Sequence, residues 1–514
     1  MTFLFTKLRS SIEPSQTGLA IGQPIFLGLR PYSLVFFGGI NLILIQWVLV
    51  RELTAVLLGS ELVILLVTVV YFIGLSVGYR VSHRIQRRWL APLGIMTLLL
   101  HLSLPIWLRL MIAWFDSLNA YGLAFLLPLF IVPFVVSAFY SVFLPLFADS
   151  GQGHLPSLYA VEVLGSAVGV LSLVVLGGLG IVGVFTLYAV VMLGILWALK
   201  LNRVWLLLLA VWSTGWLVAF PALNNWSNTL WFQQIQGLPV GTATLFTGYS
   251  PYQKVDALET PAGARYLYLD GLEHFGSASG EWLNIMMGRI PASMTQPDNA
   301  LVFGAGSMQM ALMIANYSAH VTTVELDPMV ANVSISFFAQ YNFMDRLTNR
   351  TVIIDDAKHF IATTEQTYDL IATDLPGAFM IQTGALYTVP FYESVAQKLR
   401  PGGVFVVNLT SDFTPDALAS RRIAASLLNV FDDVMIVTSR SAGWSFAYVS
   451  NDLPFSREDV QQAIEVAGET SFGVFETSAV RAIVGDARPL TLDSMDIVLQ
   501  SSLDRVAKRL GWDE

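Results

Sequence analysis

Two strand ends in the C-terminal half of the chain have the residue types of a nucleotide-binding site. The stretch FGAGS holds Gly304 and Gly306, which allow a tight turn and a close approach of the backbone to a ligand. About 20 residues further on, VELD ends the next predicted strand with Glu325 and Asp327. An acid at that place can accept hydrogen bonds from ribose hydroxyls, and Glu325 has the better strand phase.

Two further strand ends add acids that could complete such a site. IIDDA offers Asp356, with Asp355 as the second choice, to meet an adenine amine. YDLIATDLPGA places Asp374 where a strand opens into a loop, and as a general base it would take a proton from a nucleophilic amine. All these acids have a structural alternative, because carboxylates at strand ends also cap the helices that follow. We favour an adenosine-type ligand and leave both roles open for Asp374.

Alternating strand and helix patterns place these stretches on one sheet. Two alternating runs, QKVDALE and ARYLYLD, flank TPAG and predict a hairpin. Strands are then predicted near 299–303, 320–326, 352–355, 368–373, 402–409, 433–439 and 444–450. Helices are predicted near 308–316, 328–340, 388–399 and 415–428, and DSMDIVLQSSLDRVAKRL predicts an amphipathic helix packed on this domain. The pattern predicts a doubly wound α/β, Rossmann-like domain that binds ligands beyond the carboxyl ends of its strands.

The composition of the whole chain is that of a membrane protein. Of its 514 residues 54% are hydrophobic and 13% charged, against about 25% charged in soluble domains. The formal net charge of −9 excludes a basic footprint for nucleic acid. The absence of cysteine excludes disulfides and thiolate metal sites, and we predict no metal site.

The N-terminal half predicts an α-helical membrane bundle. A bilayer-spanning helix needs about 20 apolar residues, and seven runs qualify, at 32–50, 62–79, 90–108, 121–147, 157–176, 180–199 and 204–220. The first residues lack the pattern of a cleaved signal peptide. We divide the chain into a tail (1–31), a multi-span transmembrane domain (32–220), a connector (221–248), a small β region (249–298), the Rossmann-like domain (299–453) and a C-terminal helical extension (454–514).

Basic residues predict the orientation of the bundle. If the spans alternate, three basic clusters share one side: Lys7, Arg9 and Arg30; Arg80, Arg84, Arg87 and Arg88; Lys200 and Arg203. The positive-inside rule then puts the N-terminus in the cytoplasm of a multi-pass protein of the cell (inner) membrane. Seven crossings would leave the C-terminal domain outside, whereas one run that does not cross would leave it inside, so the sequence leaves its side open.

Two charged residues of the bundle have alternative interpretations. Glu162 lies inside the fifth run and Arg51 at the end of the first. They could form a polar pocket or small-molecule path, because ionisable groups at membrane depth often mark function. They could instead form a buried ion pair that fixes helix packing, aided by Gly165 and Gly169 at small-xxx-small spacing. We favour the structural interpretation.

A run of motifs in consistent order over about 250–450 resembles the spermidine/spermine synthases, the polyamine aminopropyltransferases. It reads SPYQKV, YLYLDGLEHFG, RIPAS, ALVFGAG, VTTVELDP, DDAKHFI, YDLIATDLPG and LYTVPFYESVAQKLRPGGVFVVNL. The membrane half, with REL, GSE and YAVEVLGSAVG, resembles the multi-span bacterial branch of that family. The resemblance implies a small β region before a methyltransferase-type domain.

The same resemblance implies a reaction and its participants. The family transfers an aminopropyl group from decarboxylated S-adenosylmethionine to putrescine or a related amine. Decarboxylated S-adenosylmethionine (or S-adenosylmethionine) would be a co-substrate, with no tightly bound cofactor. The implied partners are the lipid bilayer and a small amine, and family members commonly form homodimers. A subunit of a membrane complex is the other assembly that we consider.

The resemblance also implies roles for individual residues. It places Gln253 near the donor, Glu325 at the ribose, Asp356 at the adenine and Asp374 as the catalytic carboxylate. On the substrate side it implies Asp270, His274 and Tyr392. Asp270 and Gly271 belong to the family's Leu-Asp-Gly, and His274 replaces a family glutamine. Tyr392 forms, with Phe391, the family's recurring Phe-Tyr, which follows Tyr387.

The chain departs from the family where the amine should bind. Ser307 occupies the place of the aspartate that holds the aminopropyl amine, and Leu283, Asn284 and Ile285 replace a Tyr-His-Glu stretch. DLPGA has lost the second acid of its loop. A cationic amine needs carboxylates to replace its lost water, and these departures remove carboxylates from the site where the amine would bind. The residues at the adenosine end are therefore better kept than those at the amine end. Three functions follow: aminopropyl transfer, S-adenosylmethionine-dependent methyl transfer, or a degenerate domain acting as a binding or assembly module.

Overall fold

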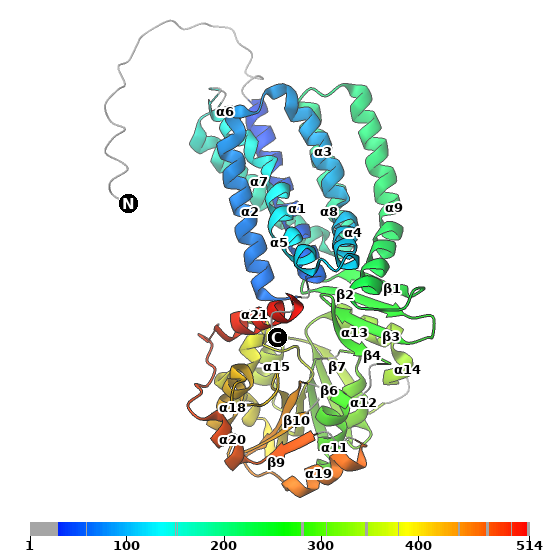
Figure 1. Ribbon diagram of the computed structural model, residues 1–514, viewed down its shortest axis with the longest axis vertical. Helices are drawn as coiled ribbons and strands as arrows, with labels where there is room; N and C mark the ends of the chain where they lie inside the picture. The colour runs from blue at the N-terminus through cyan, green and yellow to red at the C-terminus, as the bar shows by residue number, and fades with distance from the viewer. Residues whose placement is uncertain are drawn as a thin grey trace, which may run out of the picture.

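A computed structural model describes residues 29–510, apart from 58, 150, 152, 279–281, 305, 345–347, 379, 440–442, 469–471 and 495. A bundle of long helices stands on an α/β domain that contains both β-sheets (Figure 1). The predicted tail, 1–31, lies almost entirely outside the described residues.

The bundle contains nine helices in the part of the chain that the structure describes. They are α1 (Leu29–Val56), α2 (Glu61–Val81), α3 (Leu90–Leu102), α4 (Leu104–Ser117), α5 (Tyr121–Ala138), α6 (Phe143–Asp149), α7 (Leu155–Leu176), α8 (Gly180–Ala198) and α9 (Arg203–Ile235). Six of these are individually long and apolar enough to cross a bilayer, and α3 with α4 forms a pair bent by 69°. The predicted run 90–108 is therefore broken at Ser103, just before the proline of LPIW begins α4.

The bent pair crosses the bundle as one unit. α3 begins at the face away from the α/β domain, where Gly94 contacts Leu196 near the end of α8. α4 ends at the opposite face, where Asp116 accepts a hydrogen bond of 3.2 Å from Gln234 of α9. Over the described ranges the chain therefore traverses the bundle seven times, and α9 leads down into the small sheet (Figure 1).

The predicted connector is largely helical. The seventh run, expected at 204–220, is the first part of α9. This helix has 33 residues in all and continues through Pro221 to Ile235. Asn202 caps the start of α9 by accepting a hydrogen bond of 2.9 Å from the Val204 amide. The helix extends beyond the predicted run because packing against neighbouring helices tolerates its internal proline.

Close packing between α1 and α7 depends on glycine. A Cβ on Gly165 would lie 2.1 Å from the carbonyl oxygen of Phe36, and one on Gly39 would lie 2.3 Å from that of Glu162. The predicted small-residue contact is therefore present, but the predicted pairing of Glu162 with Arg51 is wrong. Tyr79 of α2 donates to Glu162 over 3.3 Å, and Arg51 lies at the other end of α1.

The α/β domain begins with a small antiparallel sheet. Its strands, in spatial and chain order, are β1 (Ala243–Tyr249), β2 (Lys254–Glu259), β3 (Arg265–Leu269) and β4 (Leu272–Gly276). The hairpin predicted around TPAG is β2–β3. Strand β1 packs against α8 and α9, so this sheet joins the bundle to the rest of the domain (Figure 1).

The main sheet has eight strands in the order β12-β10-β11-β9-β8-β5-β6-β7. They are β5 (Asn299–Phe303), β6 (His320–Glu325), β7 (Arg350–Ile354), β8 (Tyr368–Thr373), β9 (Leu399–Asn408), β10 (Asp433–Ser439), β11 (Ser445–Ser450) and β12 (Phe472–Phe475). Neighbours among β5–β9 are parallel, and β10, β11 and β12 add antiparallel pairs. The predicted doubly wound sheet is therefore confirmed, with an antiparallel edge.

Helices cover the main sheet and link it to the bundle. They are α10 (Trp282–Asn284), α11 (Ile290–Thr295), α12 (Gln309–Ala315), α13 (Pro328–Phe337), α14 (Ala339–Asn342), α15 (Ala357–Thr363), α16 (Ile381–Gly384), α17 (Val389–Ala396), α18 (Leu418–Val430), α19 (Arg457–Val466), α20 (Thr477–Val484) and α21 (Asp496–Leu510). The extension predicted as helical also supplies β12. α21 lies across the foot of the bundle and contacts α2 and α5 as well as α16 (Figure 1).

We expect the substitution Gly165→Ala to destabilise the bundle. The added methyl group would meet the backbone of α1, which cannot move without separating the two helices, and such overpacking costs about 1–3 kcal/mol. Thermal unfolding in detergent measures the loss. Gly194→Ala in α8 is the matched control, because nothing lies within 4 Å of its Cβ position; equal melting temperatures for both variants would contradict the prediction.

Candidate active site

One cavity of about 510 Å³ lies between the two sheets, beyond the carboxyl ends of the parallel strands. Its volume is typical of small-molecule sites. Eight of the nine predicted site residues line it: Gln253, Asp270, His274, Gly304, Gly306, Glu325, Asp356 and Asp374. They come from four strand ends of the main sheet and from the small sheet, so folding brings together positions up to about 120 residues apart, as the carboxyl edge of a parallel sheet does.

The glycine turn after β5 makes room for Asp374. Gly304 and Gly306 both have positive φ, of 90° and 45°. A Cβ on Gly304 would lie 2.2 Å from the carbonyl oxygen of Asp374, and one on Gly306 would lie 2.9 Å from its Oδ2. The Asp374 amide in turn donates to the Phe303 carbonyl over 2.7 Å. The glycines therefore permit the end of β8 to pack directly against the turn.

Asp374 titrates near neutral pH. Burial raises the pKa of Asp374 to about 7, and the charge of Glu325 adds to the shift. A carboxylate with this pKa is half ionised at neutral pH, which suits a general base.

The two acids after β6 have different contacts. Glu325 lines the cavity and accepts a hydrogen bond of 2.8 Å from the Asp327 amide. Asp327 also lines the cavity, but it caps α13 through the Met329 amide (2.9 Å) and accepts 2.6 Å from the Ser250 hydroxyl. Asp327 thus has the structural role that the sequence left open.

Asp356 caps a helix and also lines the cavity. It caps α15 by accepting from the amides of Lys358 (2.8 Å) and His359 (3.2 Å), and it also lines the cavity. The neighbouring Asp355 lines the cavity too, with its Oδ2 2.8 Å from His359 Nδ1, a contact that lowers the pKa of Asp355. The end of β7 therefore presents two carboxylates.

The small sheet supplies the opposite wall. Asp270 lies in the β3–β4 turn with a φ of 46°, and its Oδ1 accepts from the Lys254 amide over 2.8 Å. Burial raises the pKa of Asp270 to about 6, although the Lys254 amide and the Arg51 guanidinium oppose the shift. Gln253 precedes β2 and His274 lies in β4, and both side chains reach the cavity.

Tyr392 lies elsewhere, contrary to the predicted substrate-binding role. It is fully buried in the core beneath the main sheet, with its ring 5.6 Å from that of Phe405. Ser307 is also buried, its hydroxyl accepting from the Gln309 amide at 3.3 Å, and it does not line the cavity. Asn284, in the replaced Tyr-His-Glu stretch, donates to the Gln309 side chain over 2.8 Å and lies outside the cavity as well.

Sequence reasoning missed the loop that follows β8. It supplies apolar lining from Leu375, Pro376, Met380 and Leu386, and polar lining from Gln382 and Thr383. The signal was present in DLPGA, since a loop that opens at the carboxyl end of a parallel strand covers the ligand site.

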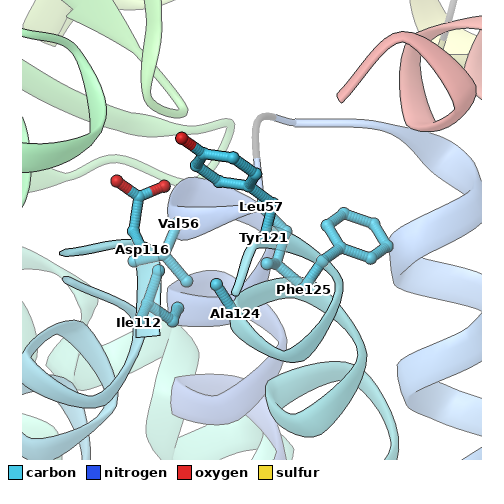
Figure 2. Close-up of a pocket in the computed structure, with 7 residues that line it drawn as sticks. All are labelled: Val56, Leu57, Ile112, Asp116, Tyr121, Ala124 and Phe125. Carbon is cyan, nitrogen blue, oxygen red and sulfur yellow. The ribbon is translucent and has the colours of Figure 1, made fainter. Parts of the chain in front are cut away.

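A second hollow, at the foot of the bundle, is far smaller. It lies between α1, α4 and α5 and measures about 20 Å³, with Val56, Leu57, Ile112, Asp116, Tyr121, Ala124 and Phe125 around it (Figure 2). Such a volume suits a water molecule. This hollow is therefore too small to serve as part of a small-molecule path.

The charge of the large cavity selects the ligands it can take. Six of the described lining residues carry carboxylates, Asp270, Glu325, Asp327, Asp355, Asp356 and Asp374, and Lys358 is the one lysine or arginine among them. Apolar side chains cover much of the remaining wall. An apolar or aromatic group with hydroxyl donors and a positive charge complements this lining.

Comparison with known proteins identifies the domain around this cavity. Residues 283–452 match the family model of the spermine/spermidine synthase domain. The polyamine aminopropyltransferase of Thermoplasma volcanium is 27% identical over 241 residues, covering 45% of this chain and 86% of the relative. That of Lachnospira eligens is 28% identical over 218 residues (40% and 75%), and spermidine synthase 1 of Pisum sativum is 30% identical over 197 (36% and 59%). The chain therefore joins a spermidine synthase-like α/β domain to a helical N-terminal region.

We expect Asp374→Asn to raise stability at alkaline pH. Between the unfolded pKa of 3.8 and the folded pKa of about 7, the folded protein holds a proton that the unfolded chain has lost, so stability falls as pH rises through this window. Asparagine removes this penalty. We expect the free energy of unfolding of the variant to exceed that of the wild type by about 1–2 kcal/mol above pH 7. The gain is smaller than a fully enclosed carboxylate would give, because this side chain faces a cavity.

Thermal unfolding of the two proteins at pH 4 and pH 8 measures this difference. The melting temperatures should converge at pH 4 and separate at pH 8. A variant less stable than the wild type at pH 8 would show that Asp374 is not held in an environment that disfavours its charge.

Proposed function

We propose that this chain is a membrane-anchored aminopropyltransferase that joins an aminopropyl group from decarboxylated S-adenosylmethionine to an amine. One observation supports it above all: carboxylates from separate strand ends meet around one cavity, in a domain that matches the spermine/spermidine synthase family. The relatives named above suggest the reaction class, and the acidic cavity suits a cationic donor and a cationic acceptor.

The donor would lie along the carboxyl edge of the main sheet. Glu325 would accept hydrogen bonds from the ribose hydroxyls, and Asp356 would meet the adenine amine with the oxygen that does not cap α15. The turn at Gly304 and Gly306 lets the backbone approach the ligand closely. Gln253 would close the site from the small sheet.

Asp374 would then act as the general base. The carboxylate accepts a proton from the ammonium or amine of the acceptor, whose nitrogen attacks the methylene carbon next to the sulfonium. The new C–N bond forms as the C–S bond breaks, and the bonding electrons return to sulfur to give neutral methylthioadenosine. The positive charge of the sulfonium passes to the newly bonded nitrogen, and the proton taken from the acceptor remains on Asp374 until solvent removes it.

A binding module without turnover is the second candidate. Ser307, at the position of the family's amine-holding aspartate, is buried and hydrogen bonded within its own loop. The remaining acids at the amine side are Asp270 and Asp374, and both have raised pKa values. A protein that had kept only the nucleoside half would still bind the donor or methylthioadenosine while leaving the amine unchanged.

We expect Asp374→Asn to abolish turnover while nucleoside affinity changes less than about threefold, because the base is distinct from the residues at the ribose. Calorimetry of the full chain in detergent with decarboxylated S-adenosylmethionine, S-adenosylmethionine and methylthioadenosine measures binding, and release of methylthioadenosine measures turnover. Wild-type kcat/KM should rise with pH through about 7, as Asp374 ionises.

Glu325→Gln is the matched control on the nucleoside side. It keeps the base but weakens the ribose hydrogen bonds, so we expect affinity to fall about tenfold or more. Binding without turnover in the wild type would favour the binding module, and preference for the carboxylated donor would favour methyl transfer. Absence of any binding would reject both transfer reactions and a module that binds the nucleoside.

We further propose that the bundle spans the cell membrane with the α/β domain outside the cytoplasm. The bundle exposes large apolar side chains, among them Val174, Val175 and Val218, as lipid-facing helices do. Exposed basic residues lie at the face away from the α/β domain: Arg80, Arg84, Arg87, Arg88, Lys200 and Arg203. Within the described residues Arg51 and Arg109, near the other face, are engaged in contacts with the protein itself. The positive-inside rule then orients the far face to the cytoplasm.

Fusion reporters test this orientation. Alkaline phosphatase joined to the C-terminus should be active and green fluorescent protein at the same place dark. The control is a fusion after Leu201, at the far face between α8 and α9, which should give the opposite pattern. A fluorescent C-terminal fusion would overturn the orientation. An active phosphatase fusion would separate the site from a cytoplasmic donor and favour the binding or assembly module over aminopropyl transfer.

A further inference from the structure

The wall of the cavity formed by the small sheet rests on the foot of the bundle. Gly59, between α1 and α2, lies so close to the β3–β4 turn that an added Cβ would be 3.1 Å from Asp270 Cβ. Gly271 lies next to the carbonyl of Ala55 in α1, and its own carbonyl accepts from the Gln236 side chain over 2.8 Å. The turn that carries Asp270 is therefore held between helices α1 and α9.

The opposite loop of the cavity also touches the bundle. Glu61, the first residue of α2, accepts a hydrogen bond of 3.3 Å from the Ile381 amide at the start of α16. The flanking side chains of Met380 and Gln382 line the cavity. Bundle contacts thus reach two separate walls of the same site.

Arg51 makes the strongest of these contacts. Its Nη1 donates to the carbonyl of Tyr252 over 2.6 Å, and its Nη2 donates to the carbonyl of Pro251. The guanidinium also lies over the ring of Trp47, 5.9 Å from its centroid. Tyr252 and the next residue, Gln253, both line the cavity. The planar fork of arginine therefore clamps a segment of the cavity wall to α1.

The clamped segment is a tight loop that Ser250 and Asp327 also restrain. The amides of Tyr252 and Gln253 both donate to the Ser250 hydroxyl, each over 3.0 Å. That hydroxyl donates in turn to Asp327 at the end of β6. Arg51 binds the same loop from the side of the bundle, so the segment is fixed between the bundle and the main sheet.

Arg51 also acts on the charge of the site. Asp270 is faced by Arg51 from α1 and by Lys254 and Asp256 from β2. The two cations favour the ionised carboxylate, whereas Asp256 and burial disfavour it. Removing Arg51 would therefore raise the pKa of Asp270.

We propose that Arg51 is a positioning residue for the cavity, through which the helical bundle fixes the Pro251–Gln253 segment of the cavity wall. The consequence for catalysis rests on the aminopropyl transfer proposed above, but the positioning does not. The α/β domain alone would lack this clamp, so its ligand site depends on the bundle.

Hydrogen–deuterium exchange of the full chain in detergent tests the positioning without any ligand. In Arg51→Gln the amides of Tyr252, Gln253 and Lys254 should exchange about tenfold faster or more, because each is bonded within the clamped wall. Arg87→Gln, exposed at the far face, is the matched control and should leave them unchanged. Equal protection in both variants would overturn the proposal, whether or not the protein is an enzyme.

The pH dependence of binding separates positioning from a general loss of structure. For decarboxylated S-adenosylmethionine, a cation, Arg51→Gln should weaken binding about tenfold or more and move the pH midpoint of binding upward. Arg51→Lys should restore the pH midpoint, because lysine keeps the positive charge. It should not restore the affinity, because lysine lacks the planar guanidinium fork that binds both carbonyls. An unchanged midpoint in Arg51→Gln would reject the electrostatic part. If the wild type binds no nucleoside, the proposed function fails and the exchange data alone decide the positioning.

Discussion

A buried ion pair at the foot of the bundle anchors the small sheet through the hydroxyl of Tyr249. Arg109 of α4 and Glu52 of α1 meet at 2.8 Å with no solvent exposure of either side chain, and the hydroxyl of Tyr249 in β1 donates to Glu52. Beside them, Lys254 of β2 pairs with Asp256 at 2.7 Å. Breaking such a pair leaves an uncompensated buried charge, at a cost of about 3–5 kcal/mol. The small sheet is therefore fastened to the helices before it can serve as a wall of the cavity.

Much of the α/β domain could be predicted from the sequence because its strands are short, apolar and bounded by turn residues. The predicted strands 368–373 and 433–439 coincide with β8 and β10. The four-residue β12 was missed, because its single buried residue gives no pattern of alternation. In the bundle the pattern failed where tertiary packing overrides local preference, as at Pro221 inside α9 and at the bend between α3 and α4.

The residues of the cavity could be predicted from the sequence where the geometry of the parallel sheet alone determines their positions. Acids that follow parallel strands must meet at one edge, and Glu325, Asp356 and Asp374 do so. Tyr392 was misplaced because a Phe-Tyr pair inferred from resemblance says nothing of which face of α17 is buried. Arg51 was unpredictable as a neighbour of the site, since it lies 201 positions before the carbonyl it binds. No local pattern encodes such a contact.

The two ends of the cavity are therefore controlled by different parts of the fold. The nucleoside end depends on β5, β6 and β7, whose glycines and acids are fixed within the main sheet. At the amine end the loop residue Ser307 faces inward, which leaves Asp270 and Asp374 as the carboxylates nearest the small sheet and β8. Arg51, which belongs to a helix of the bundle, is one of the groups that favour the ionised form of Asp270. The charge that a cationic ligand would meet is thus set in part by the helices, so the bundle contributes to the site.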